Sequence, residues 1–228
     1  MKKIISSFIT TVLTVIALTA TICAFYSCKK PEDLSVYVSE LRADVLEGRS
    51  ENFFVRCVYG FRETPYAADG EIGTREYSLT FFLPENDTDD VNYALSFTLN
   101  GNAQGGIFVK DKVSSKLSLT LPVKNFSQKT LTVKISHASE SETAELHSIV
   151  PQNCMNYRTA LESLNKNQPS LINSMKDGGS FNGEICMRII VKDGKAYWYA
   201  GLSDGKDFLK ALLIDGVSGE ILATRTVL

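Results

Sequence analysis

The sequence predicts a mainly β protein: an antiparallel β-sandwich followed by a small α+β domain, with a signal or transmembrane helix at the N-terminus. Three observations support this fold class. An uncharged apolar run opens the chain, short alternating segments recur up to residue 150, and a helical period appears only after Pro151. The expected parts are residues 1–28 (anchor), 34–150 (sandwich) and 152–228 (α+β domain).

The apolar run is long enough to cross a membrane. Lys2 and Lys3 precede an uncharged segment over residues 4–27, and a helix of that length could reach roughly 36 Å, more than the ~30 Å hydrocarbon core. The two lysines form a positive n-region that stays cytoplasmic. We therefore expect the rest of the chain outside the cytoplasm, tethered to the cell membrane.

The residues around Cys28 leave the form of the tether open. The stretch 25–30, FYSCKK, resembles a relaxed bacterial lipobox in which Cys28 would be lipidated. Ser27 fits that pattern, whereas Phe25 stands where leucine is usual. The alternative is an uncleaved single-pass anchor with Cys28 as an incidental thiol. Ordinary cleavage is the weakest prediction, because residues 22–24 form a poor A-x-A site.

Charge and cysteine content exclude some classes. Without Lys2 and Lys3 the chain carries 22 basic and 26 acidic residues, a formal charge of −4, which argues against a nucleic-acid partner. Cys57, Cys154 and Cys186 show neither CxxC nor zinc-ligand spacing. We expect small apolar core residues, with one disulfide as the alternative.

The segment up to residue 150 predicts about eight strands. Residues 38–46 alternate apolar and charged side chains, so their charged face should meet water. Residues 53–62 follow a turn and alternate so that Cys57 points inward. Further strands are expected at 75–83, 91–100, 107–110, 116–123, 130–137 and 143–149, with 101–106 as a hairpin loop.

Strands in this number, without helical segments between them, favour an immunoglobulin-like β-sandwich, because each sheet must cover its apolar face with another. The likeness is one of architecture. The single tryptophan, Trp198, lies outside this part of the chain, so the Cys-Trp-Cys core of immunoglobulin domains is missing.

After Pro151 the pattern predicts a helix and a four-stranded meander. Tyr157, Leu161 and Leu164 recur at helical spacing behind Asn156, a plausible N-cap, and 170–175 could add further turns. Asp-Gly pairs at 193–194, 204–205 and 215–216 are hairpin signals. The expected strands are 184–192, 195–203, 206–214 and 220–226.

This region resembles the PepSY-type domain, from about residue 155 to 228. Residues 198–206 and 213–221 carry the resemblance, and Asp215, Gly219, Glu220 and Ile221 match the typical strand-Asp-turn-Gly ending. Ser218 and Gly216 replace the usual threonine and alanine. The resemblance implies a non-catalytic, extracytoplasmic module of the kind found in peptidase propeptides and cell-envelope proteins, with an inhibitory or regulatory binding role.

Candidate sites are few. In one hairpin register His137 and His147 would face each other, and with nearby glutamates they could hold zinc or respond to pH. A one-residue slip would separate them, and two exposed imidazoles are the alternative. The acidic loop 85–90 could offer oxygens to calcium but lacks the EF-hand glycine and final glutamate. The long loop 63–74 is the other interaction candidate, through Tyr66, Asp69 and Glu71, with a strand crossover between the sheets as the equal alternative.

These observations predict a membrane-tethered, non-catalytic binding or accessory protein of the bacterial cell envelope, with a protein partner. No catalytic residue, metal ligand or cofactor is assigned, because the sequence holds no nucleophile elbow and no phosphate loop. The first alternative is a regulator or inhibitor of an extracellular peptidase. The second is a metal- or carboxylate-dependent enzyme.

Overall fold

The computed structural model describes residues 32–65, 72–83, 92–110, 116–205 and 209–227. The predicted anchor with Cys28, the acidic loop 85–90 and the interaction residues Tyr66, Asp69 and Glu71 lie outside the described residues. Within these ranges, no helix combines the length and the apolar character needed to cross a membrane. Residues Leu34–Leu228 form one compact unit.

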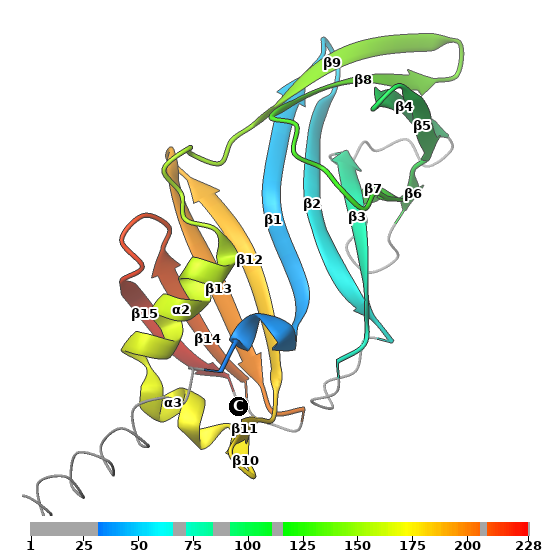
Figure 1. The fold of residues 1–228 in the computed structure, drawn as a ribbon. Helices are drawn as coiled ribbons and strands as arrows, with labels where there is room; N and C mark the ends of the chain where they lie inside the picture. The colour runs from blue at the N-terminus through cyan, green and yellow to red at the C-terminus, as the bar shows by residue number, and fades with distance from the viewer. Residues whose placement is uncertain (1–31, 66–71, 84–91, 111–115, 206–208, 228) are drawn as a thin grey trace, which may run out of the picture. The chain divides into compact units, whose positions relative to one another are not determined.

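The fold is mainly β, as predicted, and most strand pairs are antiparallel. In the described part of the chain, thirteen strands join in one large, nearly closed sheet, and two more form a small hairpin (Figure 1). The first strands are β1 (Val38–Arg49), β2 (Phe54–Thr64), β3 (Thr74–Leu83), β4 (Tyr93–Leu99), β5 (Asn102–Ile107), β6 (Val109–Lys110), β7 (Leu117–Pro122), β8 (Thr130–His137) and β9 (Glu140–Ser148). The remaining elements are η1 (Leu34–Tyr37), α2 (Tyr157–Asn167), α3 (Pro169–Ser174), β10 (Lys176–Asp177), β11 (Ser180–Phe181), β12 (Glu184–Lys192), β13 (Lys195–Ser203), β14 (Leu209–Asp215) and β15 (Ile221–Val227).

Strand β1 connects the two parts that the sequence pattern distinguishes. One of its edges pairs with β2 along the whole hairpin. The other edge pairs in parallel with β12 over residues 38–42 and then antiparallel with β9 through Leu46 and Glu47. No pattern in the sequence predicts this parallel pair, through which the C-terminal meander continues the sheet that β1, β2 and β3 begin (Figure 1).

A β-bulge lies where β1 changes partner. Arg42 pairs with Gly60 and Asp44 with Tyr59, so β1 holds one residue more than β2 at this point. A Cβ atom at Gly60 would overlap the carbonyl oxygen of Leu41. The two backbones can therefore approach this closely only because residue 60 has no side chain.

The prediction about the charged face of β1 is wrong at one residue. The charged face of 38–46 was expected to meet water, but Glu40 is only 8% exposed. Strand β12 pairs beside β1 at this position, and the guanidinium groups of Arg42 and Arg188 lie against the Glu40 carboxylate and shield it from water.

A hydrophobic core fills the space between two groups of strands in the N-terminal part. Residues of β2, β3 and β7 pack against residues of β4, β8 and β9, and Cys57 is fully buried among them, as predicted. The largest side chains enclosed there include Leu46, Leu79, Phe81, Leu95, Ile135 and Leu146.

The prediction of a loop at 101–106 is wrong, because β5 begins at Asn102 and pairs with β4. Asn100 and Gly101 both adopt positive φ, at 50° and 80°. This is the arrangement of a two-residue hairpin turn, for which Asn-Gly is the preferred sequence. The turn therefore takes only two residues, and pairing resumes at once.

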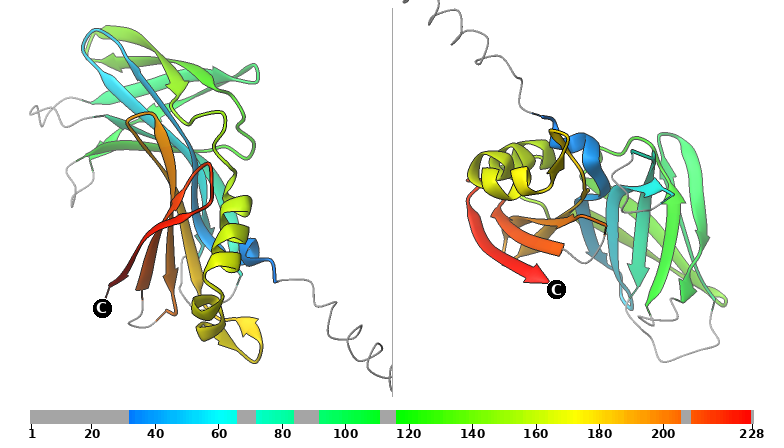
Figure 2. Two further views of the ribbon diagram at one scale, coloured as in Figure 1. Left: turned by 90° about the vertical axis from the view of Figure 1, so that its left-hand side faces the viewer. Right: turned by 90° about the horizontal axis from the view of Figure 1, so that it is seen from below.

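The C-terminal part agrees closely with the prediction. Asn156 caps α2 by accepting a hydrogen bond from Thr159 N through its side chain. Helices α2 and α3 cover one face of the β12–β15 meander (Figure 2). Their apolar residues share a second core with the meander and with the first half of β1. That core takes members from both sides of Pro151, and the boundary there stays a prediction.

The three described cysteines are free thiols. Burial raises the pKa of Cys57, Cys154 and Cys186, so each thiol keeps its proton at neutral pH. Cys57 matches the expected core residue, while Cys154 and Cys186 are half-buried.

The close approach at the bulge predicts that Gly60→Ala lowers the free energy of unfolding by about 2 to 3 kcal/mol, because backbone must move to admit the methyl group. Gly106→Ala is the matched control. Its Cβ would overlap only the side-chain end of Leu119, at 2.8 Å, which can rotate away, and would make an ordinary contact with Leu121 at 3.7 Å. Urea denaturation of both variants measures the difference. Equal loss of stability in the two would show that the bulge imposes no special requirement for glycine.

Candidate functional site: a cationic groove on the uncovered sheet face

Alternation along the strands gives the sheet two different faces. In β12 and β13, Met187 and Trp198 point into the core beneath α2 and α3, whereas Arg188 and Tyr199 point the opposite way. In β2, Cys57 lies in the other core while Val58 faces out with them. The side chains that face out line two adjoining hollows across β3, β2, β1, β12 and β13.

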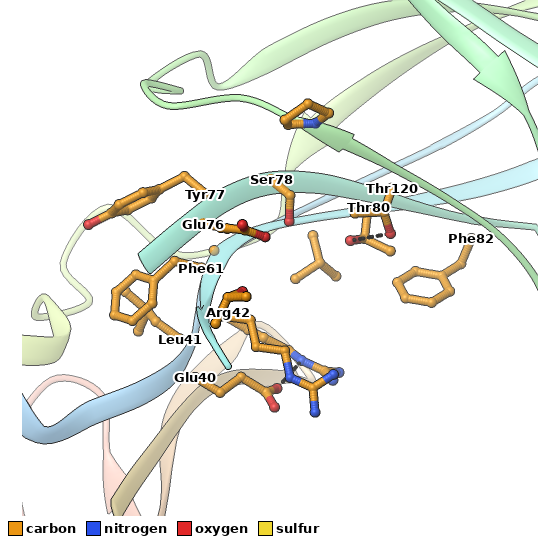
Figure 3. Close-up of a pocket in the computed structure, with 15 residues that line it drawn as sticks. Glu40, Leu41, Arg42, Phe61, Glu76, Tyr77, Ser78, Thr80, Phe82 and Thr120 are labelled. Atoms are coloured by element: carbon orange, nitrogen blue, oxygen red, sulfur yellow. Dashed lines mark hydrogen bonds and ion pairs between the residues drawn. The ribbon is translucent and has the colours of Figure 1, made fainter. Parts of the chain in front are cut away.

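The first hollow lies over β1, β2 and β3 and has a volume of about 560 Å³ (Figure 3). Val58, Gly60 and Phe82 contribute apolar surface, and the hydroxyl groups of Thr80 and Thr120 lie 3.1 Å apart at one side. Charged residues of both signs line it: Glu40, Arg42, Arg62 and Glu76.

The second hollow lies over β1, β2, β12 and β13 and has a volume of about 680 Å³. It shares Arg42, Val58 and Phe82 with the first, so the two form one groove. Its described lining contains four basic residues and no acidic one. The basic residues are Arg42, Arg56, Lys116 and Arg188.

The Glu40 carboxylate holds two of these guanidinium groups in place. Arg188 donates from Nε to Glu40 Oε1 at 3.0 Å and from Nη2 to Oε2 at 3.2 Å, and Arg42 donates from Nε to Oε1 at 2.9 Å. The Glu40 side chain is 11% exposed, while those of Arg42 and Arg188 are 46% and 41% exposed. One buried carboxylate therefore holds two half-exposed cations, and the three groups together carry a charge of +1.

The other two cations of the second hollow are held more loosely. Arg56 Nε lies 3.6 Å from Glu47 Oε1, with both side chains partly exposed. Lys116 is exposed at the start of β7. Because exposed pairs at this distance contribute little, both cations can turn toward a ligand at small cost. The groove is thus an apolar hollow bordered by positive charge on a chain whose net charge is negative.

The hairpin register that would bring His137 and His147 together does not occur, and the alternative of two separate, partly exposed imidazoles holds. His137 pairs with Glu140 and His147 with Thr130, at opposite ends of the β8–β9 hairpin, which separates them by about 23 Å of strand. The hairpin turn takes only two residues, so the register differs from the one that would oppose them. Nor do the described residues contain a group of three or more His, Cys, Asp and Glu side chains able to hold a metal ion.

The sequence pattern predicts an interaction site in the loop 63–74 and does not predict the groove. The signal was present, because Arg42, Arg56 and Arg188 stand at the outward positions of their alternating strands. What could not be read from the sequence is that β12 lies beside β1 and brings Arg188 to Glu40.

The Glu40 contacts predict that Glu40→Gln lowers the free energy of unfolding by about 2 kcal/mol, because charge-assisted hydrogen bonds to two arginines are weakened in a buried position. Glu47→Gln removes the looser pair with Arg56 and should cost under about 0.5 kcal/mol. Thermal and urea denaturation of both variants test the contrast. A Glu40→Gln variant as stable as Glu47→Gln would contradict the role given to Glu40.

No family model matches the chain, and no significant match is found among curated proteins or solved structures.

Proposed function

We propose that this chain is a membrane-tethered, extracytoplasmic, non-catalytic binding or accessory protein of the bacterial cell envelope, and that it holds a protein partner in the groove. The observation that carries the proposal is the groove itself, with its apolar floor and its two guanidinium groups fixed by Glu40. Hollows of this size and mixed character suit the binding of a ligand or a partner segment.

The tether follows from the apolar run of residues 4–27, either as an uncleaved anchor or through lipid on Cys28. Side-chain contacts hold the beginning of the described chain, η1, in place. Arg75 donates from Nη2 to the carbonyl oxygens of Ser35 and Val36, at 2.7 and 2.9 Å, and its guanidinium lies 4.7 Å from the centre of the Phe61 ring. These contacts tie η1 to β2 and β3, which would give a tethered body a fixed point of attachment.

For the architecture, we propose that residues 34–150 are an immunoglobulin-like sandwich in which β1 and β2 extend beyond the usual limits. The enclosed core between β2, β3, β7 and β4, β8, β9 supports this. It leaves the long β1–β2 hairpin free to join the meander.

A second candidate function is the regulation of an extracellular peptidase by a PepSY-like C-terminal part. Its support is the turn after β14. Asp215 Oδ1 accepts hydrogen bonds from Val217 N at 2.9 Å and Ser218 N at 2.8 Å, and these bonds lower the pKa of Asp215. Gly219 closes the turn at φ 75°, and Val217 is 54% exposed at its tip.

Site-specific photo-cross-linking in the native cell tests the proposal. Tyr199, in the groove, is replaced by p-benzoylphenylalanine, and Tyr157, a half-buried tyrosine on α2, serves as the matched control. We expect one partner to be captured at Tyr199 and not at Tyr157. The purified partner should then bind the full chain at least tenfold more weakly after Ile190→Asp, in the groove, than after Leu222→Asp, on β15.

Equal capture at Tyr199 and Tyr157, or equal affinity of the two aspartate variants, would reject the groove as the binding surface. A third probe at Val217 separates the two candidates. A secreted peptidase captured there, with nothing captured at Tyr199, would favour the peptidase regulator.

A further inference from the structure

We infer that the groove takes an extended, acidic peptide segment of about six residues, whose carboxylates meet the basic end and whose apolar side chains cover the floor. The inference rests on the proposed function and names the chemistry of the partner. It is carried by three features of the groove: its charge, its length and the way its cations are held.

The positive charge of the groove favours a negatively charged ligand. The described lining of the second hollow holds four cations and no acid, and with the paired Glu40 and Glu47 included these groups still carry a charge of 4 − 2 = +2, whereas the whole chain is acidic. A concentration of one charge in a hollow with apolar walls strengthens its field and attracts ligands of the opposite sign. The first hollow contains Glu40 and Glu76 as well as arginines, so the acidic end of the peptide should lie in the second hollow, where Arg42, Arg56 and Arg188 extend from β1, β2 and β12.

The length of the groove favours an extended peptide over a compact ligand. Together the two hollows cross β3, β2, β1, β12 and β13. Neighbouring strands lie about 4.8 Å apart, so four intervals span roughly 19 Å. An extended peptide rises about 3.3 Å per residue, and about six residues fill that distance.

The held arginines suit carboxylates. Within the described residues, Glu40 meets Arg42 through Nε alone, so the two Nη groups of Arg42 can donate to a ligand. A planar guanidinium can bind a carboxylate through two parallel hydrogen bonds, and a guanidinium already fixed in place loses less conformational entropy on binding. Arg56 and Lys116 add two adaptable cations nearby.

The apolar floor of the groove requires apolar side chains in the peptide as well as acidic ones. Val58 and Phe82 are half-buried, and Ile190 is 40% exposed. The cations and the floor lie on the same face of the sheet, and side chains of an extended peptide alternate in direction, so a peptide that carries its acids toward one end and its apolar residues toward the other can satisfy both.

The probe is an acetylated hexapeptide of three aspartates followed by three leucines, titrated by fluorescence anisotropy into the full chain held in phosphatidylcholine nanodiscs. We expect it to bind at least tenfold more tightly than the same peptide with lysine for aspartate, or with serine for leucine. Affinity should fall about tenfold in Arg42→Gln and about threefold in Lys116→Gln, and it should weaken as salt rises.

The matched controls are Arg158→Gln on α2 and Lys134→Gln on β8, which remove the same charges outside the groove and should leave the affinity unchanged. Circular dichroism identifies any variant that fails to fold, and the charge-reversed and serine peptides test the inference on the unaltered chain. The inference is wrong if the acidic peptide binds no better than these two, or if free aspartate or inorganic phosphate binds as tightly.

The two proposals can fail separately. If a partner is captured at Tyr199 but the hexapeptide neither binds nor competes with it, the groove binds a partner of another chemistry and only this inference falls. If nothing is captured there and no peptide binds, both proposals fall.

Discussion

The parallel pairing of β1 with β12 is the interaction on which the rest of this structure depends. It joins strands 146 residues apart, as the Ser39–Ile185 hydrogen bond illustrates. It also gives the meander a neighbour on its β12 edge, opposite β15, so that α2 and α3 cover one face of a sheet that extends beyond the C-terminal residues. Without this pair, Arg188 and Tyr199 would not lie on the same surface as Arg42 and Val58, and the groove would not exist.

The bulge and the ion pairs adapt β1 to this position. Because β12 ends its pairing at Arg42 and β9 begins at Leu46, β1 must turn from one partner to another within a few residues. The extra residue opposite Gly60 supplies that bend. Glu40, placed beside β12 by the pairing, then requires cationic partners, because an unpaired buried carboxylate is costly. The same arrangement that satisfies Glu40 leaves two guanidinium groups facing the groove.

Local physical signals in the sequence predicted the local features of the fold. β12 and β13 have the predicted bounds because Asp193-Gly194 fixes a two-residue turn, both residues having positive φ. Asn156 caps α2 because a side-chain oxygen can reach the free N–H groups of the first turn. The missed β5 was a local error, since Asn100-Gly101 carries the same turn chemistry. By contrast, the β1–β12 pair, the bulge and the groove depend on contacts between distant segments. No period or spacing within either segment specifies them.

Cutting the chain next to Pro151 tests most directly whether the parts before and after it are held together by the shared sheet. A protease site inserted between the exposed residues Gln152 and Asn153 allows cleavage in the folded state. Size-exclusion chromatography of the cleaved protein then measures whether the two fragments separate. If β1 and β12 share one sheet and one core, the fragments elute together and part only in denaturant. Fragments that separate under native conditions, each still folded, would contradict the shared sheet and with it the groove.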